Sequence, residues 1–182
     1  LRHWVARLGA SPALLVTLLR DRCYHSPEQK RSSVWVNGGN EEIAALTIGP
    51  ADKITVVGST EGTVGRVVVL ARFLANGEPD AAFGEQGVSL IGIGTDASAE
   101  GILERDDGTY VVSGSYEEKK KFSAMLLGVR SDGTVDTGFG DRGVAVPAGS
   151  FAASEGYGLA GDGDGLIYVA GAVGAPGARD TA

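Results

Sequence analysis

Hydrophobic residues along the chain fall into short runs that are separated by polar, glycine-rich segments. Four successive runs, at residues 43–48, 54–58, 66–73 and 88–91, have the length and the β-branched content of strands. The third run is almost continuously apolar from 67 to 71, which is typical of a strand buried on both faces. This pattern predicts a unit of four antiparallel strands.

The same order of runs recurs along the chain. The segment ITVVGS at 54–59 lies 56 positions before YVVSGS at 110–115, and IYVAG at 167–171 begins 57 positions after residue 110. A short apolar piece precedes each of these segments, at 44–46, 101–102 and 158–159. Asp107-Gly108 and Asp164-Gly165 separate the two runs in the later copies, and Asp-Gly between apolar runs favours a hairpin turn.

A four-stranded unit that recurs every 50 to 60 residues or so cannot bury both of its faces alone. Such units pack face to face, as the blades of a β-propeller do. The sequence therefore predicts an all-β protein with propeller-type blades of four antiparallel strands, in an incomplete ring of two full blades plus partial ones. Repeat 1 is expected at 41–96, repeat 2 at 97–153 with its strands within 100–146, and a partial repeat 3 at 154–182.

Residues 1–40 have two interpretations. Residues 4–15 (WVARLGASPALL) can be a degenerate partial blade, in which Ala6-Arg7-Leu8 corresponds to Ala71-Arg72-Phe73 of repeat 1. Alternatively, a short helix or tail runs through residue 19 and a polar linker follows at 21–33.

Two similar phrases mark the corner between the third and fourth strands, GEPDAAFGEQGV at 77–88 and GTVDTGFGDRGV at 133–144. Each phrase is expected to hold a turn glycine, an aspartate in an Asx turn and a phenylalanine that points inward as an anchor. A glycine in a conformation that other residues avoid follows the phenylalanine, and a second glycine begins the last strand and allows close backbone approach. The predicted structural residues are Asp80, Phe83, Gly84 and Gly87 in repeat 1, and Asp136, Phe139, Gly140 and Gly143 in repeat 2.

The segment LARFLANGEPDAAFGEQGV at 70–88 resembles the bacterial delta-60 repeat, in which Ala-Arg is followed by Asp/Asn-Gly-x-x-Asp-x-x-Phe-Gly-x-x-Gly. Repeat 2 departs from this pattern at Gly128 and Val129, where repeat 1 has Arg72 and Phe73. The resemblance covers about residues 41–171. It implies propeller-like blades, a bacterial and often secreted protein with an extracellular or cell-surface location, and no known catalytic residue or cofactor.

Composition narrows the choice of partner. The 29 glycines suit a protein with many tight turns, and the net charge of −7 with a pI near 4.8 repels a phosphate backbone, so nucleic acid is not an expected partner. One cysteine and two histidines offer no zinc site. The longest apolar run, at 13–19, is shorter than the ~20 residues that span a membrane.

Two features imitate ligand sites. GIGTDA at 92–97 resembles part of a dinucleotide fingerprint without the helix that should follow it, and GDGDG at 161–165 resembles a calcium loop without the distal glutamate. We expect a linker and a turn there, and no cofactor. The only metal-ligand candidates are acidic residues at the blade entrances, Glu42, Glu100 and Glu155, which are interpreted first as solvated charges.

Two functions follow from these observations. The favoured hypothesis is a non-catalytic binding or scaffolding module, and not an enzyme, with an unknown protein or carbohydrate ligand. The alternative is part of a propeller enzyme of the metal-dependent hydrolase type, with its site facing the channel. Since two full and two partial blades cannot close a ring, we expect either a part of a longer chain or a homodimer that exchanges partial blades.

Overall fold

The computed structural model describes residues 14–18, 30–34, 41–147, 153–162 and 165–174. These ranges contain twelve strands, one short 3-10 helix and no α-helix. All strand pairs are antiparallel. The predicted all-β class is confirmed.

Repeat 1 forms a four-stranded sheet in the order β3-β4-β5-β6. Its strands are β3 (Glu42–Ile48), β4 (Ile54–Glu61), β5 (Arg66–Phe73) and β6 (Val88–Ile91), and the 3-10 helix η1 (Pro50–Asp52) joins the first two. The structure confirms all four predicted runs, with β4 continuing three residues past its expected end at residue 58.

Repeat 2 repeats this topology, and repeat 3 contributes two strands. The second sheet contains β7 (Asp96–Glu104), β8 (Tyr110–Glu118), β9 (Lys121–Val129) and the short β10 (Val144–Ala145), in the order β10-β9-β8-β7. β11 (Ala153–Gly161) pairs with β12 (Ile167–Gly174). β7 and β11 each begin one residue before the expected repeat boundaries at 97 and 154.

The described part of residues 1–40 is a strand pair. β1 (Leu14–Leu18) runs antiparallel to β2 (Lys30–Val34). A strand thus occupies 14–18, where one interpretation of the sequence placed a helix, and β2 occupies the end of the expected linker. The proposed counterpart of Ala71-Arg72-Phe73 at residues 6–8 lies outside the described residues.

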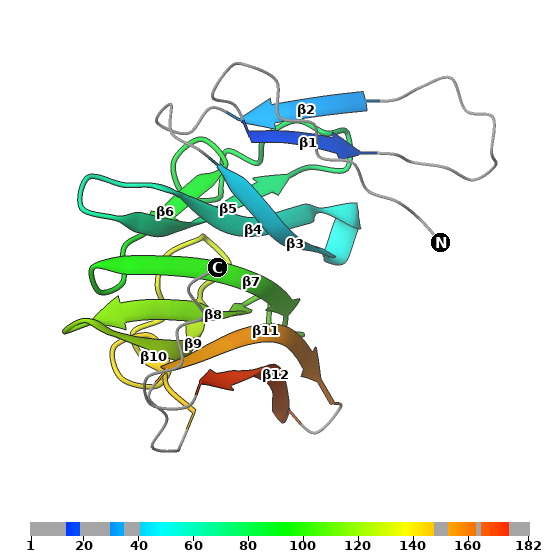
Figure 1. Ribbon diagram of the computed structural model, residues 1–182. Coiled ribbons are helices and arrows are strands. Elements are labelled where there is room, and N and C mark those ends of the chain that lie inside the picture. Colours follow the sequence, from blue (N-terminus) through cyan, green and yellow to red (C-terminus); the bar gives the residue numbers. More distant parts are fainter. Residues whose placement is uncertain (1–13, 19–29, 35–40, 148–152, 163–164, 175–182) are drawn as a thin grey trace.

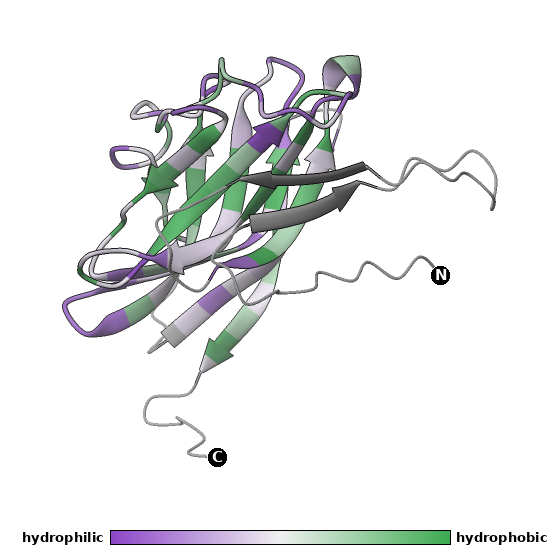
Figure 2. Ribbon diagram, turned by 90° about the horizontal axis from the view of Figure 1, so that it is seen from above, coloured by the Kyte–Doolittle hydropathy of each residue, from purple (hydrophilic) through white to green (hydrophobic). Residues whose placement is uncertain are grey.

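The sheets stack face to face without closing into a ring, so the incomplete propeller-like arrangement is confirmed (Figure 1). The β1–β2 pair lies at the end of the stack next to repeat 1, and the β11–β12 pair lies at the other end (Figure 1). The first strands of the repeats are neighbours, because β7 contacts β3 on one side and β11 on the other. Figure 2 shows apolar residues concentrated in the strands and polar residues in the connecting loops.

Repeats 1 and 2 share one hydrophobic core. β5 contributes to the packing on both of its faces, since Val68 and Leu70 belong to the core shared with repeat 2, whereas Ala71 and Phe73 belong to a second cluster with Val56. This confirms that the third strand is buried on both faces. The fully or largely buried members of the shared core are Val57, Val68, Leu70, Phe83 and Ile91 from repeat 1, and Ala97, Ala99, Tyr110, Val112, Met125, Leu127 and Val129 from repeat 2.

Each first strand carries a β-bulge at the same place. The register shifts lie between residues 43 and 45 in β3, 99 and 101 in β7, and 156 and 158 in β11. A glycine faces each bulge from the second strand, and a Cβ there would overlap a backbone carbonyl oxygen of the first strand. The bulge therefore requires glycine, and these glycines are Gly58, Gly114 and Gly171.

Candidate functional site

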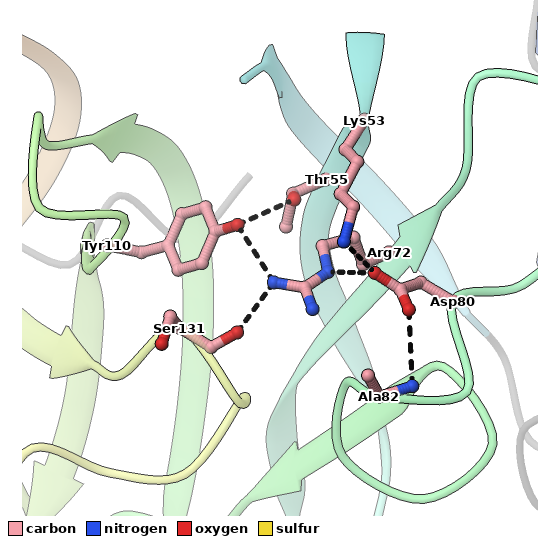
Figure 3. Close-up of polar contacts among 7 residues, drawn as sticks. All are labelled: Lys53, Thr55, Arg72, Asp80, Ala82, Tyr110 and Ser131. Carbon is pink, nitrogen blue, oxygen red and sulfur yellow. Dashed lines mark hydrogen bonds and ion pairs between the residues drawn. The ribbon is translucent and has the colours of Figure 1, made fainter. Parts of the chain in front are cut away.

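A buried arginine lies at the boundary between repeats 1 and 2. Arg72 comes from the end of β5, and only 8% of its side chain is exposed. Its Nε donates to Oδ2 of Asp80 at 2.8 Å, and its Nη1 donates to the backbone carbonyl oxygen of Ser131 in repeat 2 at 2.6 Å. Figure 3 shows the guanidinium between these two acceptors. One side chain thus connects its own repeat to the next.

The corner phrase and the η1 turn position the other charges. Asp80 forms the expected Asx turn, because its Oδ1 accepts a hydrogen bond from the backbone N–H of Ala82 at 3.2 Å. Lys53, directly after η1, donates from Nζ to Oδ2 of Asp80 at 2.8 Å (Figure 3). The carboxylate therefore binds two cations and a backbone N–H, which offsets the cost of burying it.

Aromatic rings complete the contact between the repeats. Cζ of Arg72 lies 4.6 Å from the centroid of the Phe83 ring, within the range of a cation–π interaction. Phe83 in turn meets Tyr110 of repeat 2 edge to face, at a centroid distance of 6.1 Å. The Tyr110 hydroxyl oxygen accepts long hydrogen bonds from Thr55 Oγ1 at 3.3 Å and from Arg72 Nη1 at 3.4 Å (Figure 3).

The pKa shifts agree with this geometry. Burial by itself raises the pKa of Asp80, but the hydrogen bonds from Lys53 and Ala82 and the charges of Arg72 and Lys53 outweigh it, so the pKa is lowered. Burial raises the pKa of the nearby Glu104, against the opposing effects of Arg72, Tyr110 and Lys53. Asp80 is therefore the ionised partner of the two cations, and it holds the guanidinium of Arg72, whose Nη1 donates to Ser131 of repeat 2.

The equivalent place in repeat 2 is built differently. Gly128 replaces Arg72, and the ring of Phe139 packs directly against it, so that a Cβ at Gly128 would meet the ring carbons. Asp136 keeps its Asx turn, with its Oδ1 accepting from Gly138 N–H at 3.1 Å, but its cation Arg130 is 3.7 Å away and half exposed. We call the contacts of Arg72 with Asp80 and Ser131 the arginine clamp. Among the described residues this clamp occurs once, at the boundary of repeats 1 and 2.

The turn of one repeat caps the corner of the repeat before it. The backbone N–H of Gly84 donates to the carbonyl oxygen of Asp132 at 2.7 Å, and Ser89 Oγ donates to the carbonyl oxygen of Gly133 at 2.6 Å. Gly133 has φ +89°, and a Cβ on it would come within 3.2 Å of the Phe83 ring. An Asp-Gly turn therefore fits closely on a Phe-Gly corner.

The conformation predicted for Gly84 and Gly140 is observed, and Gly87 and Gly143 share it. All four lie in the left-handed region, with φ +55° at Gly84, +57° at Gly140, +92° at Gly87 and +102° at Gly143. The two phenylalanines differ, however. Phe83 is fully buried, whereas Phe139 is only partly buried. Both were expected to turn inward, and Phe139 is less buried than Phe83 because no turn caps it among the described residues.

The structure brings the three candidate glutamates near one another. Burial raises the pKa of Glu100, and the charges of Glu42 and Glu155 raise it further, while Arg66 opposes them. All three glutamates are exposed, and Glu155 accepts a hydrogen bond from the Tyr157 hydroxyl at 2.6 Å. Within the described residues, no group of three or more histidine, cysteine, aspartate or glutamate side chains is arranged to hold a metal ion.

The two sequence features that imitate ligand loops have structural roles. Gly94, with φ +62°, precedes β7, so a strand stands where a dinucleotide fold requires a helix. Asp162 closes the turn between β11 and β12, because its Oδ1 accepts from Leu166 N–H at 2.9 Å and its Oδ2 from the Tyr168 hydroxyl at 3.1 Å. Asp164 lies outside the described residues.

Sequence reasoning missed the clamp around Arg72. Lys53, Tyr110 and Ser131 lie in three separate segments, and nothing in their spacing from Arg72 predicts that they converge. One signal was available, since Asp80 follows Arg72 by eight residues, directly across the corner from the end of the strand.

Comparison with models of known protein families finds no match, and comparison with curated proteins finds none either. No helix in the described part of the chain has the length and apolar character needed to cross a membrane. The resemblance to delta-60 repeats therefore stays a prediction.

Proposed function

We propose that this chain is a non-catalytic β-propeller-type repeat module with a binding or scaffolding role, and that its ligand is a protein or a carbohydrate. The observation that carries the proposal is that the charges at the boundary of repeats 1 and 2 bind one another and the next repeat. Arg72 and Lys53 both bind Asp80, and Nη1 of the arginine donates to the backbone of the next repeat. Charges engaged in this way stabilise a stack of repeats.

The resemblance of residues 41–171 to delta-60 repeats supports the same proposal, since that family implies no catalytic residue. It also leads us to propose a bacterial, exported protein with an extracellular or cell-surface location. The corner residues that carry the resemblance, Asp80, Phe83, Gly84 and Gly87, contact the next repeat or shape the turn that does.

A metal-dependent hydrolase is the second candidate. It is favoured by the proximity of Glu42 and Glu155 to Glu100, because their charges raise the pKa of Glu100. Metal analysis of the purified chain separates the two proposals. The scaffold proposal predicts no stoichiometric divalent ion after dialysis against buffer without chelator. A bound ion that Glu100→Gln and Glu155→Gln remove, with Glu118→Gln as an exposed control, would establish the hydrolase-type site instead.

A further inference from the structure

The turn between β8 and β9 carries three consecutive lysines, Lys119, Lys120 and Lys121, which we call the lysine turn. Glu118 pairs with Lys121 at the last position of the hairpin, and the other two lysines form the turn at the side of the stack (Figure 1). All three lysines are exposed. None of them makes an ion pair with a described residue, although Glu118 lies opposite Lys121 in the register.

The backbone of the lysine turn is strained. Lys119 has φ +51° and Lys120 has φ +63°, so both lie in the left-handed region. Two positive φ angles at the centre of a two-residue hairpin are those of a type I′ turn, which prefers Asn-Gly. A lysine at each position lowers the stability of the turn, because its Cβ crowds the backbone in this conformation. Strain of this kind concentrates at functional sites.

Repeat 1 forms the same hairpin without this strain. Thr63 and Val64 lie 56 positions before Lys119 and Lys120, and neither has a positive φ. Glycines flank them at 62 and 65, where the first donates its N–H to the carbonyl oxygen of the second at 2.8 Å. The fold therefore does not require two lysines with positive φ at this place.

The charges next to the two hairpins are used differently. In repeat 1, Arg66 binds Oδ1 of Asp96 in repeat 2 through its Nε at 3.2 Å and its Nη2 at 3.1 Å. In repeat 2, Glu117 accepts a hydrogen bond from Thr95 Oγ1 at 3.1 Å, so its carboxylate is held by the segment before β7. The cation of repeat 1 thus joins two repeats, whereas the lysine turn presents its ammonium groups to solvent.

The charge of the whole chain limits what the lysine turn can bind. With a net charge of −7, the rest of the chain repels an extended polyanion such as DNA or an anionic membrane. Membrane-binding clusters also contain about four to eight cations, more than the turn provides. A short acidic peptide segment avoids this repulsion, because it can contact the turn while most of the chain lies beyond a Debye length of ~8 Å.

We propose that the lysine turn binds an acidic segment of a partner protein, whose aspartate and glutamate carboxylates accept hydrogen bonds from the three ammonium groups. The contact is electrostatic and exposed, so it weakens as the salt concentration rises. The inference rests on the proposed binding function and names the class of partner. It also explains why strained lysines stand where repeat 1 has an unstrained turn.

Fluorescence anisotropy with a dye-labelled hexaglutamate peptide measures this binding on the full chain. We expect saturable binding at low ionic strength that weakens severalfold when NaCl is raised to about 0.3 M. A hexaglutamine peptide with the same label is the control for the dye and the backbone, and it should not bind.

A variant that relieves the strain separates binding from stability. Lys119→Asn with Lys120→Gly removes two charges and installs the preferred type I′ pair. We expect its affinity for hexaglutamate to fall about tenfold or more, while its thermal unfolding temperature stays the same or rises. Arg105→Gln with Arg142→Gln removes the same charge from two other exposed positions and should leave the affinity within about twofold.

Four results would overturn the proposal. The first is no binding at low ionic strength, and the second is an equal loss of affinity in the arginine control. The third is a lower unfolding temperature in the Asn-Gly variant, since the lysines would then stabilise the turn. The fourth is tighter binding to phosphatidylserine-containing vesicles or duplex DNA that depends on the same lysines. The metal analysis is independent of all four, so this inference and the proposed function can fail separately.

Discussion

Phe83 of repeat 1 and Tyr110 of repeat 2 meet edge to face across the repeat boundary, with ring centroids 6.1 Å apart and ring planes at 87°. The guanidinium of Arg72 lies over the Phe83 ring, with its Cζ 4.6 Å from the ring centroid. One phenylalanine of the corner phrase thus contacts both a charge of its own repeat and an aromatic ring of the next. The corner is therefore an element of the interface between repeats as well as a turn within one.

The two corner phenylalanines should differ in their contribution to stability. Phe83→Ala removes a fully buried ring and is expected to lower the free energy of unfolding by about 3–5 kcal/mol. Phe139→Ala removes a partly exposed ring, so its loss should be clearly smaller. Urea unfolding of both variants measures the difference. Equal losses would show that Phe139 is covered in solution as fully as Phe83.

Aspartates at equivalent positions give a matched test of the buried clamp. Asp80→Ala leaves the buried Arg72 without its carboxylate and should cost about 3–5 kcal/mol. Asp136→Ala removes a partly exposed carboxylate whose cation is 3.7 Å away, and it should cost less than about 1 kcal/mol. Denaturant unfolding at pH 7 compares them, and a similar cost at both positions would contradict the special role assigned to Asp80.

The lowered pKa of Asp80 predicts a pH dependence. Its carboxylate stabilises the folded state above the ordinary value of 3.8, and this contribution is lost as the pH falls through the lower folded-state pKa. The stability difference between the wild type and Asp80→Asn should therefore be constant near neutral pH and shrink below about pH 4. Unfolding free energies measured from pH 7 down to pH 3 provide the test. A difference that grows on acidification would refute the ionised clamp.

The β-bulges predict which glycines tolerate a methyl group. Gly114→Ala places a Cβ against the carbonyl oxygen of Ser98 and should cost about 1–3 kcal/mol or more. Gly92→Ala is the control, because its Cβ would meet its nearest neighbour at 3.8 Å in an exposed linker. Thermal unfolding compares the two variants. Equal stability of both would argue against the close backbone approach at the bulge.

The sequence was most informative where the two repeats agree. The Asx turns of Asp80 and Asp136 and the positive φ of Gly84 and Gly140 were predictable, because the same residue types recur 56 positions apart and serve local backbone geometry. Local geometry depends on neighbours in the chain, so a sequence phrase is enough to specify it.

The sequence was least informative where the repeats differ or where distant segments meet. The convergence of Lys53 and Ser131 on the Arg72–Asp80 pair depends on how the sheets stack, which no local pattern encodes. The partial burial of Phe139 depends on what lies next to repeat 2. The bulges were also missed, although the glycines at 58, 114 and 171 recur at the repeat spacing and were a usable signal.

The central claim is that repeats 1 and 2 form one cooperative core through the corner of repeat 1. Hydrogen exchange of Phe83→Ala tests it most directly, with the exposed Val64→Ala as a control. A shared core predicts that amides of β8 and β9 in repeat 2 lose as much protection as those of β4 and β5 in repeat 1. Loss of protection confined to β4 and β5, with β8 and β9 unchanged, would contradict the account.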